Sequence, residues 1–348
     1  MTSVELQTAI ESFTVPLGYL AAASIGIPPR QAVDALAADL ALWARGARDP
    51  QDYDAVIARA RHSYASIVGV DAHRVGIGSQ TSVVASLIAA AAPEGAEVLC
   101  IDGDFTSMMF PFLQRSGIRV RVVPGEALAD SITDETWLVA FSLVQSATGV
   151  VADAAAIVDA ARRHGTRTFC DVTQAAGVLP VDASMFDASV CNTYKWLCAP
   201  RGVAFLTVTD SFAGELVPLQ AGWYAGEDVW TSTYGPAMHL AADARRFDVS
   251  PVWPAWIGAE HSIALFAGID IGEVWERTTG LGDELCERLG IPAQHQAIVT
   301  WPDSSGGDLA KLRLAGIRAA GRAGRLRASF HLWNTSADVD AVVAAIRS

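Results

Sequence analysis

The sequence predicts an α/β protein with a mostly parallel sheet flanked by helices and a smaller C-terminal α/β domain. Apolar runs of strand length, rich in Val, Ile and aromatic residues, alternate with amphipathic helical segments over most of the 348 residues. Such runs are typical of strands buried on both faces. After about Asp243 the texture changes to an irregular stretch, further helices and one short strand. We therefore expect a large domain over residues 1–245, with an N-terminal arm at about 1–17, and a small domain over residues 246–348.

Five strands and several helices are expected in the large domain. The strands are residues 97–102, 119–123, 137–144, 168–172 and 202–208. The clearest helix is 153–164, which starts at an Asp, ends in Arg-Arg-His and is followed by Gly165 as a C-cap. Residues 52–68 and 83–91 are expected to form two more helices. This alternation predicts a parallel sheet with helices on both faces.

The expected small domain begins with an irregular connection. Its signals are Pro251, Trp253, Pro254 and Trp256. Helices follow, then a short strand at 326–331 and a final helix from about residue 337.

Composition and charge exclude several classes of protein. Apolar residues make up 51% of the chain and charged residues 18%, with ten Trp, which excludes intrinsic disorder, collagen and coiled coil. Acidic residues exceed basic ones by 38 to 25, and a net charge of −13 makes nucleic acid an improbable partner. No apolar run is long enough to span a bilayer, and the first residues do not form a signal peptide, so we expect a cytoplasmic protein that does not bind membranes. The five cysteines include no C-x-x-C pair, so we expect neither a disulfide framework nor a metal site.

The chemically informative stretch is residues 168–202. Asp171 closes an expected buried strand, Gln174 follows it, and Lys195 stands in Asn-Thr-Tyr-Lys-Trp before the next strand. Ligands bind at the strand ends of open parallel sheets. A lysine amine and a carboxylate in one crevice are what pyridoxal phosphate (PLP) needs, because the amine condenses with the aldehyde and the carboxylate keeps the ring nitrogen protonated. By itself, this pair fits a structural ion pair equally well.

Seven segments, in order along nearly the whole chain, carry a resemblance to a known family. They are Tyr19 to Pro29, Gly78 to Ser82, Asp104 to Ser107, Asp171 to Gln174, Tyr194 to Gly202, Arg246 to Asp248 and Arg327 to Thr335. With them the sequence resembles the class V aminotransferases, which are fold-type I PLP-dependent enzymes. That group includes cysteine desulfurases, selenocysteine lyases, kynureninases and isopenicillin N epimerase-like proteins. The resemblance implies a fold-type I PLP-dependent transferase-like fold with PLP as cofactor.

The resemblance also implies roles for the residues around the cofactor. Lys195 is expected to be the Schiff-base lysine and the group that moves the Cα proton. Asp171 is expected to bind the pyridinium nitrogen and Gln174 the phenolic oxygen. Phe105 is expected to stack on the ring, where many relatives use histidine; simple core packing is its alternative.

The phosphate is expected at the N-terminus of the helix that follows Gly78, where free N–H groups favour anions. An ordinary Ser or Thr N-cap is the alternative interpretation of this stretch. Further residues of the cofactor site come from the strand ends, and Ser250 is expected to reach the phosphate from a second subunit. The expected cofactor-binding set, besides the residues named above, is Gln80, Thr81, Ser82, Thr173, Asn192, Tyr194 and Ser250.

Substrate binding is assigned to Arg327, because a guanidinium pairs bidentately with a carboxylate, as an α-amino acid substrate requires. Two departures from the family pattern bear on the reaction. Ala21 and Ala22 replace residues that are usually polar, and residues 309–326 contain no cysteine, which disfavours persulfide transfer through a thiol.

The favoured interpretation is a PLP-dependent enzyme of aminotransferase type that acts on a small amino acid. Cysteine desulfurase-like or C–S lyase chemistry and epimerisation are the alternatives. A non-catalytic protein with this fold is disfavoured by Lys195, Asp171 and Arg327, and a nicotinamide enzyme by the incomplete glycine motif at residues 76–78. The family resemblance implies a homodimer with the site at the interface. Trp253, Trp256 and residues 246–251 suit such an interface, with packing inside one chain as the alternative.

Overall fold

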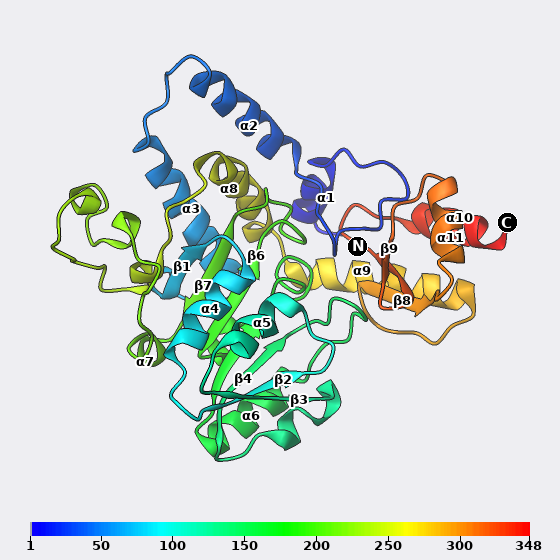
Figure 1. The fold of residues 1–348 in the computed structure, drawn as a ribbon. Coiled ribbons are helices and arrows are strands. Elements are labelled where there is room, and N and C mark those ends of the chain that lie inside the picture. The colour runs from blue at the N-terminus through cyan, green and yellow to red at the C-terminus, as the bar shows by residue number, and fades with distance from the viewer. Residues whose placement is uncertain (1) are drawn as a thin grey trace.

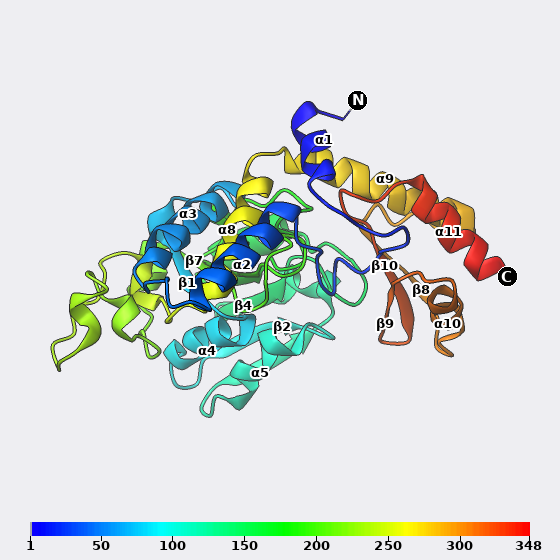
Figure 2. The same cartoon turned by 90° about the horizontal axis from the view of Figure 1, so that it is seen from above.

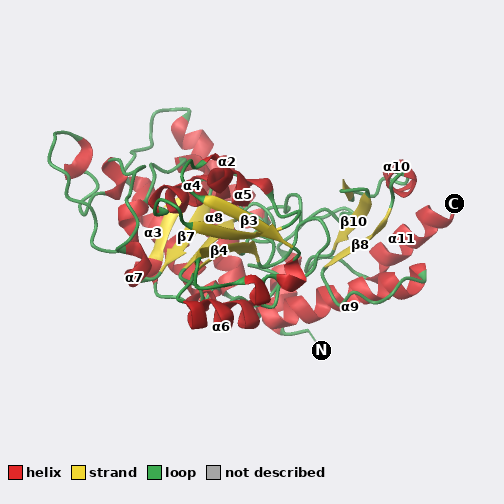
Figure 3. Cartoon of the chain, turned by 60° about the horizontal axis from the view of Figure 1, so that its bottom comes forward, coloured by secondary structure: helices red, strands yellow, loops and turns green. Residues whose placement is uncertain are grey.

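The computed structural model describes residues 2–348. A seven-stranded sheet forms its centre, in the order β1-β7-β6-β5-β4-β2-β3. The strands are β1 (Val75–Gly78), β2 (Glu97–Ile101), β3 (Arg119–Val123), β4 (Thr136–Ser142), β5 (Arg167–Asp171), β6 (Ala188–Asn192) and β7 (Ala204–Val208). Five neighbouring strands from β6 to β3 run parallel, whereas β7 is antiparallel to both β6 and β1. The expected mostly parallel sheet is confirmed (Figures 1 and 3).

Helices cover both faces of this sheet because successive side chains of a strand point to opposite sides. In β4, Val139 and Phe141 pack into the core that includes α3 and α8, whereas Leu138 and Ala140 pack into the core under α4 and α5. Figure 2 shows α3 and α8 on one side of the sheet and α4 and α5 on the other. The helices of this part are α1 (Val4–Glu11), α2 (Arg30–Trp43), α3 (Asp52–Ile67), α4 (Thr81–Ala91), α5 (Thr106–Gln114), α6 (Ala154–His164), α7 (Asp210–Ala213) and α8 (Trp253–Ala267).

A second, three-stranded antiparallel sheet lies toward the C-terminal end, in the order β8-β10-β9. Its elements are α9 (Ile271–Leu289), β8 (Ile298–Pro302), α10 (Gly307–Leu314), β9 (Ala320–Arg322), β10 (Arg325–Ser329) and α11 (Ser336–Arg347). Apolar side chains of α9, α10 and α11 share one core with this sheet. Leu20 joins that core, and isolated bridges pair Tyr19 with Arg318 and Ala21 with Ser329. The segment before α2 therefore contacts the small sheet as well as the large core.

The five expected strands and the helix at 153–164 agree with the structure to within about two residues, including the Asp153 N-cap and the left-handed Gly165 C-cap. Strands β1 and β6 of the large sheet and β8 and β9 of the small sheet were not expected. The expectation of an irregular connection around Trp253 and Pro254 is wrong, because α8 begins there. Proline is tolerated in the first turn of a helix, where its missing N–H has no intrahelical acceptor.

Helix α8 packs against α2 and α3, so it covers the large sheet although it follows residue 245. The division of the chain at residue 246 stays a prediction. Among the helices described over residues 2–348, none combines the length and the apolar character needed to cross a lipid bilayer.

Candidate active site

Lys195 lies in the turn between β6 and β7, and its side chain is almost fully buried, with 7% of the residue exposed. The chain contains only one other lysine, Lys311, which is exposed on α10 and donates to the carbonyl oxygen of Ile346 at 2.7 Å. The Lys195 turn is held from outside by Gly26, whose N–H donates to the Tyr194 carbonyl at 2.8 Å. A Cβ at residue 26 would lie 2.1 Å from the Lys195 carbonyl oxygen, so only glycine allows this approach.

Asp171 is the last residue of β5 and lies beside β6, opposite Val190. Its Oδ2 accepts a hydrogen bond from Thr81 Oγ1 at 3.1 Å, and its Oδ1 accepts one from the Thr173 N–H at 2.8 Å. Burial raises the pKa of this carboxyl group, while the Thr173 hydrogen bonds and the charge of Lys195 oppose that rise. Both oxygens therefore have protein donors, and each keeps capacity for another.

Three other residues that were assigned to the cofactor form a buried network around this carboxylate. Asn192 Nδ2 donates to Thr81 Oγ1 at 2.6 Å, and the Asn192 N–H donates to Thr173 Oγ1 at 2.9 Å. Because the Thr81 hydroxyl hydrogen goes to Asp171, this residue can offer a phosphate only its backbone N–H. The network joins the start of α4 to the ends of β5 and β6.

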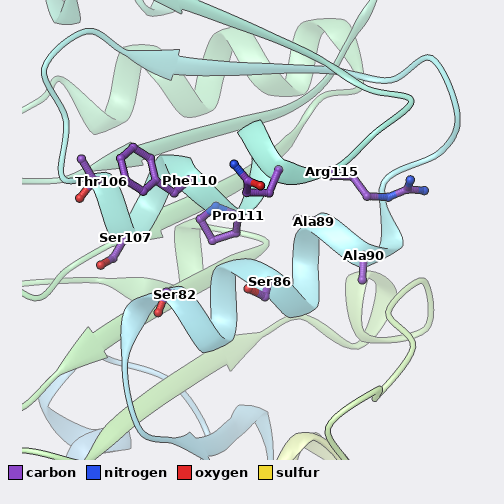
Figure 4. A pocket seen from close by; sticks show the side chains of 10 residues that line it. Ser82, Ser86, Ala89, Ala90, Thr106, Ser107, Phe110, Pro111 and Arg115 are labelled. Carbon is purple, nitrogen blue, oxygen red and sulfur yellow. The ribbon is translucent and has the colours of Figure 1, made fainter.

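The N-termini of α4 and α5 lack side-chain caps within the described chain, so their first backbone N–H groups remain open to an anion. Gln80, which precedes α4, is exposed. Ser82 is half-buried and lines a pocket of about 540 Å³ between the two helices. Figure 4 shows Ser82 and Ser86 on α4 across this pocket from Ser107 and Phe110 on α5.

Phe105 directly precedes α5 and is 39% exposed, so its ring is not a core side chain. The ring centre lies 5.4 Å from Lys195 Nζ, and the ring of Tyr194 lies 5.8 Å from the same atom. The pKa of Lys195 is lowered to about 8: burial is the main cause, the charge of Asp171 opposes the shift, and the charge of Arg327 adds to it. The amine is therefore held in a partly neutral state near physiological pH.

Gln174 connects the lysine turn to the N-terminal segment. Its Nε2 donates to the Ala23 carbonyl at 3.0 Å, and its Oε1 accepts from Trp196 Nε1 at 2.8 Å. One hydrogen of the amide nitrogen is left for a ligand.

Arg327 is the other buried cation near Lys195, with 1% of the residue exposed. Its Nη2 donates to Ser24 Oγ at 2.7 Å, its Nη1 donates to the Ser146 carbonyl, and its buried Nε has no partner among the described residues. Burial lowers the pKa of the guanidinium to about 10, with the charge of Arg322 as a second cause, so it stays charged at neutral pH. Arg325, the alternative carboxylate anchor, instead donates to Thr300 Oγ1 at 3.1 Å and to the Thr300 carbonyl at 3.0 Å.

The structure does not bring every expected residue to this cluster. Ser250 is exposed and follows Asp248, which is buried, pairs with Arg61 at 2.6 Å and accepts from the Ile77 N–H at 2.7 Å. Its expected role depends on a second subunit and stays a prediction. Arg246 lies in the same segment, and its Nε is buried without a partner in the described part of the chain.

Three residues of the cluster were not singled out from the sequence: Ser24, Gly26 and His331. His331 Nδ1 accepts from the Leu332 N–H at 2.7 Å, so its Nε2 carries the hydrogen and donates to the Trp196 carbonyl at 2.8 Å. Burial lowers the pKa of this imidazole to about 4. All three residues fall inside the quoted family segments, which were the only signal that could have found them.

These residues fit PLP. A buried amine of lowered pKa, a buried carboxylate with free acceptor capacity and two uncapped helix N-termini meet at the carboxyl ends of parallel strands. Fold and site together place the protein among the fold-type I PLP-dependent enzymes. The family model described as Aminotransferase class-V matches residues 50–302, and the chain belongs to that family. The prediction of PLP as the cofactor is confirmed by this membership. A neighbouring structure of a C-DES mutant, with glycine covalently linked to its PLP cofactor, has a TM-score of 0.85 at 22% identity.

Curated relatives with different names are similar to the chain. A kynureninase of Deinococcus radiodurans is 30% identical over 267 residues, covering 73% of this chain and 64% of that protein. An isopenicillin N epimerase of Streptomyces clavuligerus is 29% identical over 300 residues, covering 76% of this chain and 73% of that protein. The chain thus spans just under two-thirds of the kynureninase.

Solved structures share the fold. The cystine C–S lyase C-DES, in complex with cysteine persulfide, has a TM-score of 0.86 at 22% identity, covering 95% of this chain and 97% of that one. The cysteine desulfurase CsdA of Escherichia coli has a TM-score of 0.86 at 20% identity, covering 100% and 98%. At these identities the likeness concerns the fold alone.

Proposed function

We propose that this protein is a PLP-dependent enzyme acting on a small α-amino acid, with an aminotransferase-type reaction as the first candidate. The observation that carries the proposal is that Lys195, Asp171 and Arg327 are all buried and that the charges of Asp171 and Arg327 both reach the Lys195 amine. The charge of Asp171 raises the pKa of the Lys195 amine, and the charge of Arg327 lowers it. A structural ion pair between Lys195 and Asp171 explains neither the buried second cation nor the exposed aromatic ring at Lys195 Nζ.

The residues of the chain would divide the work as follows. Lys195 would hold the cofactor's aldehyde through Nζ, Asp171 would keep the ring nitrogen protonated, and Phe105 would cover one ring face. When bound, PLP supplies an electron sink for the charge left when a bond at the substrate Cα breaks. Thr81 and Thr173 fix the Asp171 carboxylate in place, so its orientation does not depend on the ligand.

Substrate binding and proton transfer fall to two cations. Arg327 would bind the α-carboxylate, displacing or sharing its contact with Ser24. Lys195, once released by the substrate amine, would take the Cα proton on Nζ and return it. An amine whose pKa lies near 8 is suited to both steps, because it is neither fully protonated nor a weak acid at neutral pH.

A C–S lyase is the second candidate, and the cysteines favour it over a thiol-relay desulfurase. All five cysteines are buried, and residues 309–326 contain none. Burial raises the pKa of Cys198, the thiol nearest to Lys195 in the sequence, so it is a poor nucleophile. Sulfur chemistry at this site would therefore proceed by elimination rather than by persulfide transfer to a protein thiol.

The test has two stages. The purified protein should show the visible absorption of a lysine-bound PLP, and borohydride followed by peptide mass spectrometry should leave the cofactor on Lys195 and not on Lys311. An amino-acid panel is then assayed for keto acid with a keto-acid acceptor, for pyruvate and sulfide, and for inversion at Cα. Modification of Lys311 alone, or no cofactor band after loading with PLP, would overturn the assignment.

We also propose that the enzyme is a cytoplasmic homodimer in which Ser250 and Tyr194 complete the phosphate site, Ser250 acting on the partner's cofactor. The exposed position of Ser250 supports this arrangement. Light scattering at micromolar concentration tests it: a monomer that retains its cofactor would remove Ser250 from the site.

A further inference from the structure

Three arginines lie on one face of the small sheet. Arg325 of β10 is paired directly with Arg322 of β9, and Arg327 is two residues further along β10. Directly paired residues share a face, and residues two apart on a strand share it as well. The sequence therefore places three guanidinium groups side by side on this face.

These charges lack counter-charges in the protein. Like charges directly opposite each other on a sheet are destabilising, and the chain has 38 acidic residues with which to neutralise them. Within residues 2–348 none of these three arginines forms an ion pair with an acidic side chain. An anion bound in front of this face would supply the missing counter-charge.

Two of the three arginines converge on a single oxygen. Ser24 Oγ accepts from Arg327 Nη2 at 2.7 Å and lies 3.4 Å from Arg322 Nη2, which also donates to it. Arg325 is already engaged by Thr300. Arg327 is buried and Arg322 is exposed, so the two form an inner and an outer cation around the Ser24 hydroxyl.

Both cations act on the space in front of Lys195. Ala23, next to Ser24, accepts the hydrogen bond from Gln174 and so fixes this segment beside the Asp171 end of the sheet. The charges of Arg327 and Arg322 both lower the pKa of Lys195. Because Arg322 and Arg327 both contact Ser24 Oγ, the outer arginine lies beside the inner one at the edge of this space.

We propose that Arg322 binds a second carboxylate of the substrate, so that this enzyme acts on dicarboxylic α-amino acids. The inference rests on the proposed function and deepens it. Arg327 binds the α-carboxylate at the bottom of the site, and Arg322 binds the side-chain carboxylate nearer to solvent. One carboxylate carries a single negative charge, and a bidentate pair with Arg327 uses both of its oxygens. A substrate with only one carboxylate would therefore leave the charge of Arg322 without a partner.

The first experiment compares isosteric substrates on the holoenzyme. L-Glutamate is set against L-glutamine, and L-aspartate against L-asparagine, for the wild type, Arg322→Gln, Arg322→Lys and the control Arg313→Gln, an exposed arginine on α10. We expect the wild type to prefer an acid over its amide by at least about 10-fold in kcat/KM, which corresponds to ~1.4 kcal/mol. Arg322→Gln should abolish that preference while changing kcat/KM for the amide substrate by less than about 3-fold. Arg322→Lys should restore part of it, and Arg313→Gln should leave it intact.

The second experiment measures binding without turnover. Calorimetry with glutarate and butyrate should show that the dicarboxylate binds more tightly to the wild type and that Arg322→Gln removes the difference. A wild type with no preference for acids, or an Arg322→Gln variant that weakens acids and amides equally, overturns the inference. Loss of PLP from Arg322→Gln would show instead that this residue serves the cofactor. Each result is read only on protein that carries the cofactor band, so failure of the proposed function is recognised separately.

Discussion

The Cα of Gly26 lies against the carbonyl oxygen of Lys195, and a Cβ there would approach that oxygen to 2.1 Å. The contact joins the N-terminal segment to the turn that carries the reactive amine. The turn is also held by the hydrogen bond from His331 to the Trp196 carbonyl. Residues from the N-terminal and the C-terminal parts of the chain therefore fix the position of Lys195.

Gly26→Ala should displace the lysine turn, because the clash is with backbone and cannot be relieved by a side-chain rotation. We expect a loss of stability of about 1–3 kcal/mol, as for overpacked cores, together with slower uptake of PLP. Thermal unfolding and the rate of appearance of the cofactor band measure the two effects. Gly280→Ala is the matched control, because nothing lies within 4 Å of a Cβ built at that helical position. Equal behaviour of the two variants would contradict the role of this contact.

Lys195→Ala should abolish turnover and the cofactor band while the protein stays folded, as judged by circular dichroism. In the wild-type apoprotein, PLP uptake should accelerate as pH rises through about 8, since only the neutral amine condenses with an aldehyde. Stopped-flow absorbance over pH 6–9.5 measures this dependence. Lys311→Arg should behave like the wild type; normal turnover in Lys195→Ala would end the PLP interpretation of this residue.

Asp171→Asn should retain the cofactor but lower kcat steeply, because a neutral amide cannot keep the ring nitrogen protonated. The substitution preserves the shape of the side chain: the amide oxygen can still accept from the Thr173 N–H, while the amide nitrogen faces the Thr81 hydroxyl as a donor. Steady-state kinetics on cofactor-saturated protein give the rate. An unchanged kcat would mean that the chemistry needs little electron withdrawal by the ring.

Arg327→Ala should raise the KM for amino acids strongly, since an unpaired substrate carboxylate costs on the order of 2–5 kcal/mol of binding. The cofactor spectrum should change little, because other groups hold PLP. Arg327→Lys should rescue binding in part, as an ammonium cannot form the bidentate pair. Loss of PLP from both variants would mean that Arg327 has a structural role. Normal substrate binding by both would mean that Arg325 or Arg246 binds the substrate carboxylate instead.

His331 should make folding sensitive to acid. Its pKa of about 4 in the folded state lies below the ordinary value of 6.5. The unfolded chain therefore binds more protons between these values, and stability falls as pH drops from about 6.5 to 4. The full effect is on the order of 3 kcal/mol for one group. Urea unfolding across this range should show a shallower pH dependence for His331→Gln, whose amide can still donate to Trp196. If the stability of the wild type and of His331→Gln depends on pH in the same way, His331 is not the cause of the acid sensitivity.

Much of the fold could be predicted because most strands of the sheet are continuous apolar runs. The two missed strands of the large sheet lack that signal: half of the residues in β1 are glycines, and β6 contains Ser189 and Asn192. Their burial is decided by neighbouring strands rather than by their own composition. Helix α8 was missed because Pro254 predicts a break, whereas proline in the first turn loses no hydrogen bond.

The site could be predicted only as far as local motifs reach. The order of Asp171, Gln174 and Lys195 is visible in one stretch of sequence, and the structure brings Thr81 and Asn192 to the same carboxylate network. The partners that fix the cluster are remote in sequence. Ser24 and His331 meet Arg327 and the lysine turn only through the arrangement of the two sheets, which no periodicity encodes.

The contacts of Gly26 and His331 with the Lys195 turn also determine when the cofactor site can form during synthesis. During synthesis the β6–β7 turn leaves the ribosome well before β10 does, and until then it lacks His331 as a neighbour. Contacts between residues so far apart in sequence form late. The entropy lost when the long loop between them closes is offset only once both residues can make the contact. We therefore expect cofactor loading only after β10 has emerged and folded, and a ribosome-bound fragment ending before β8 should remain colourless in the presence of PLP.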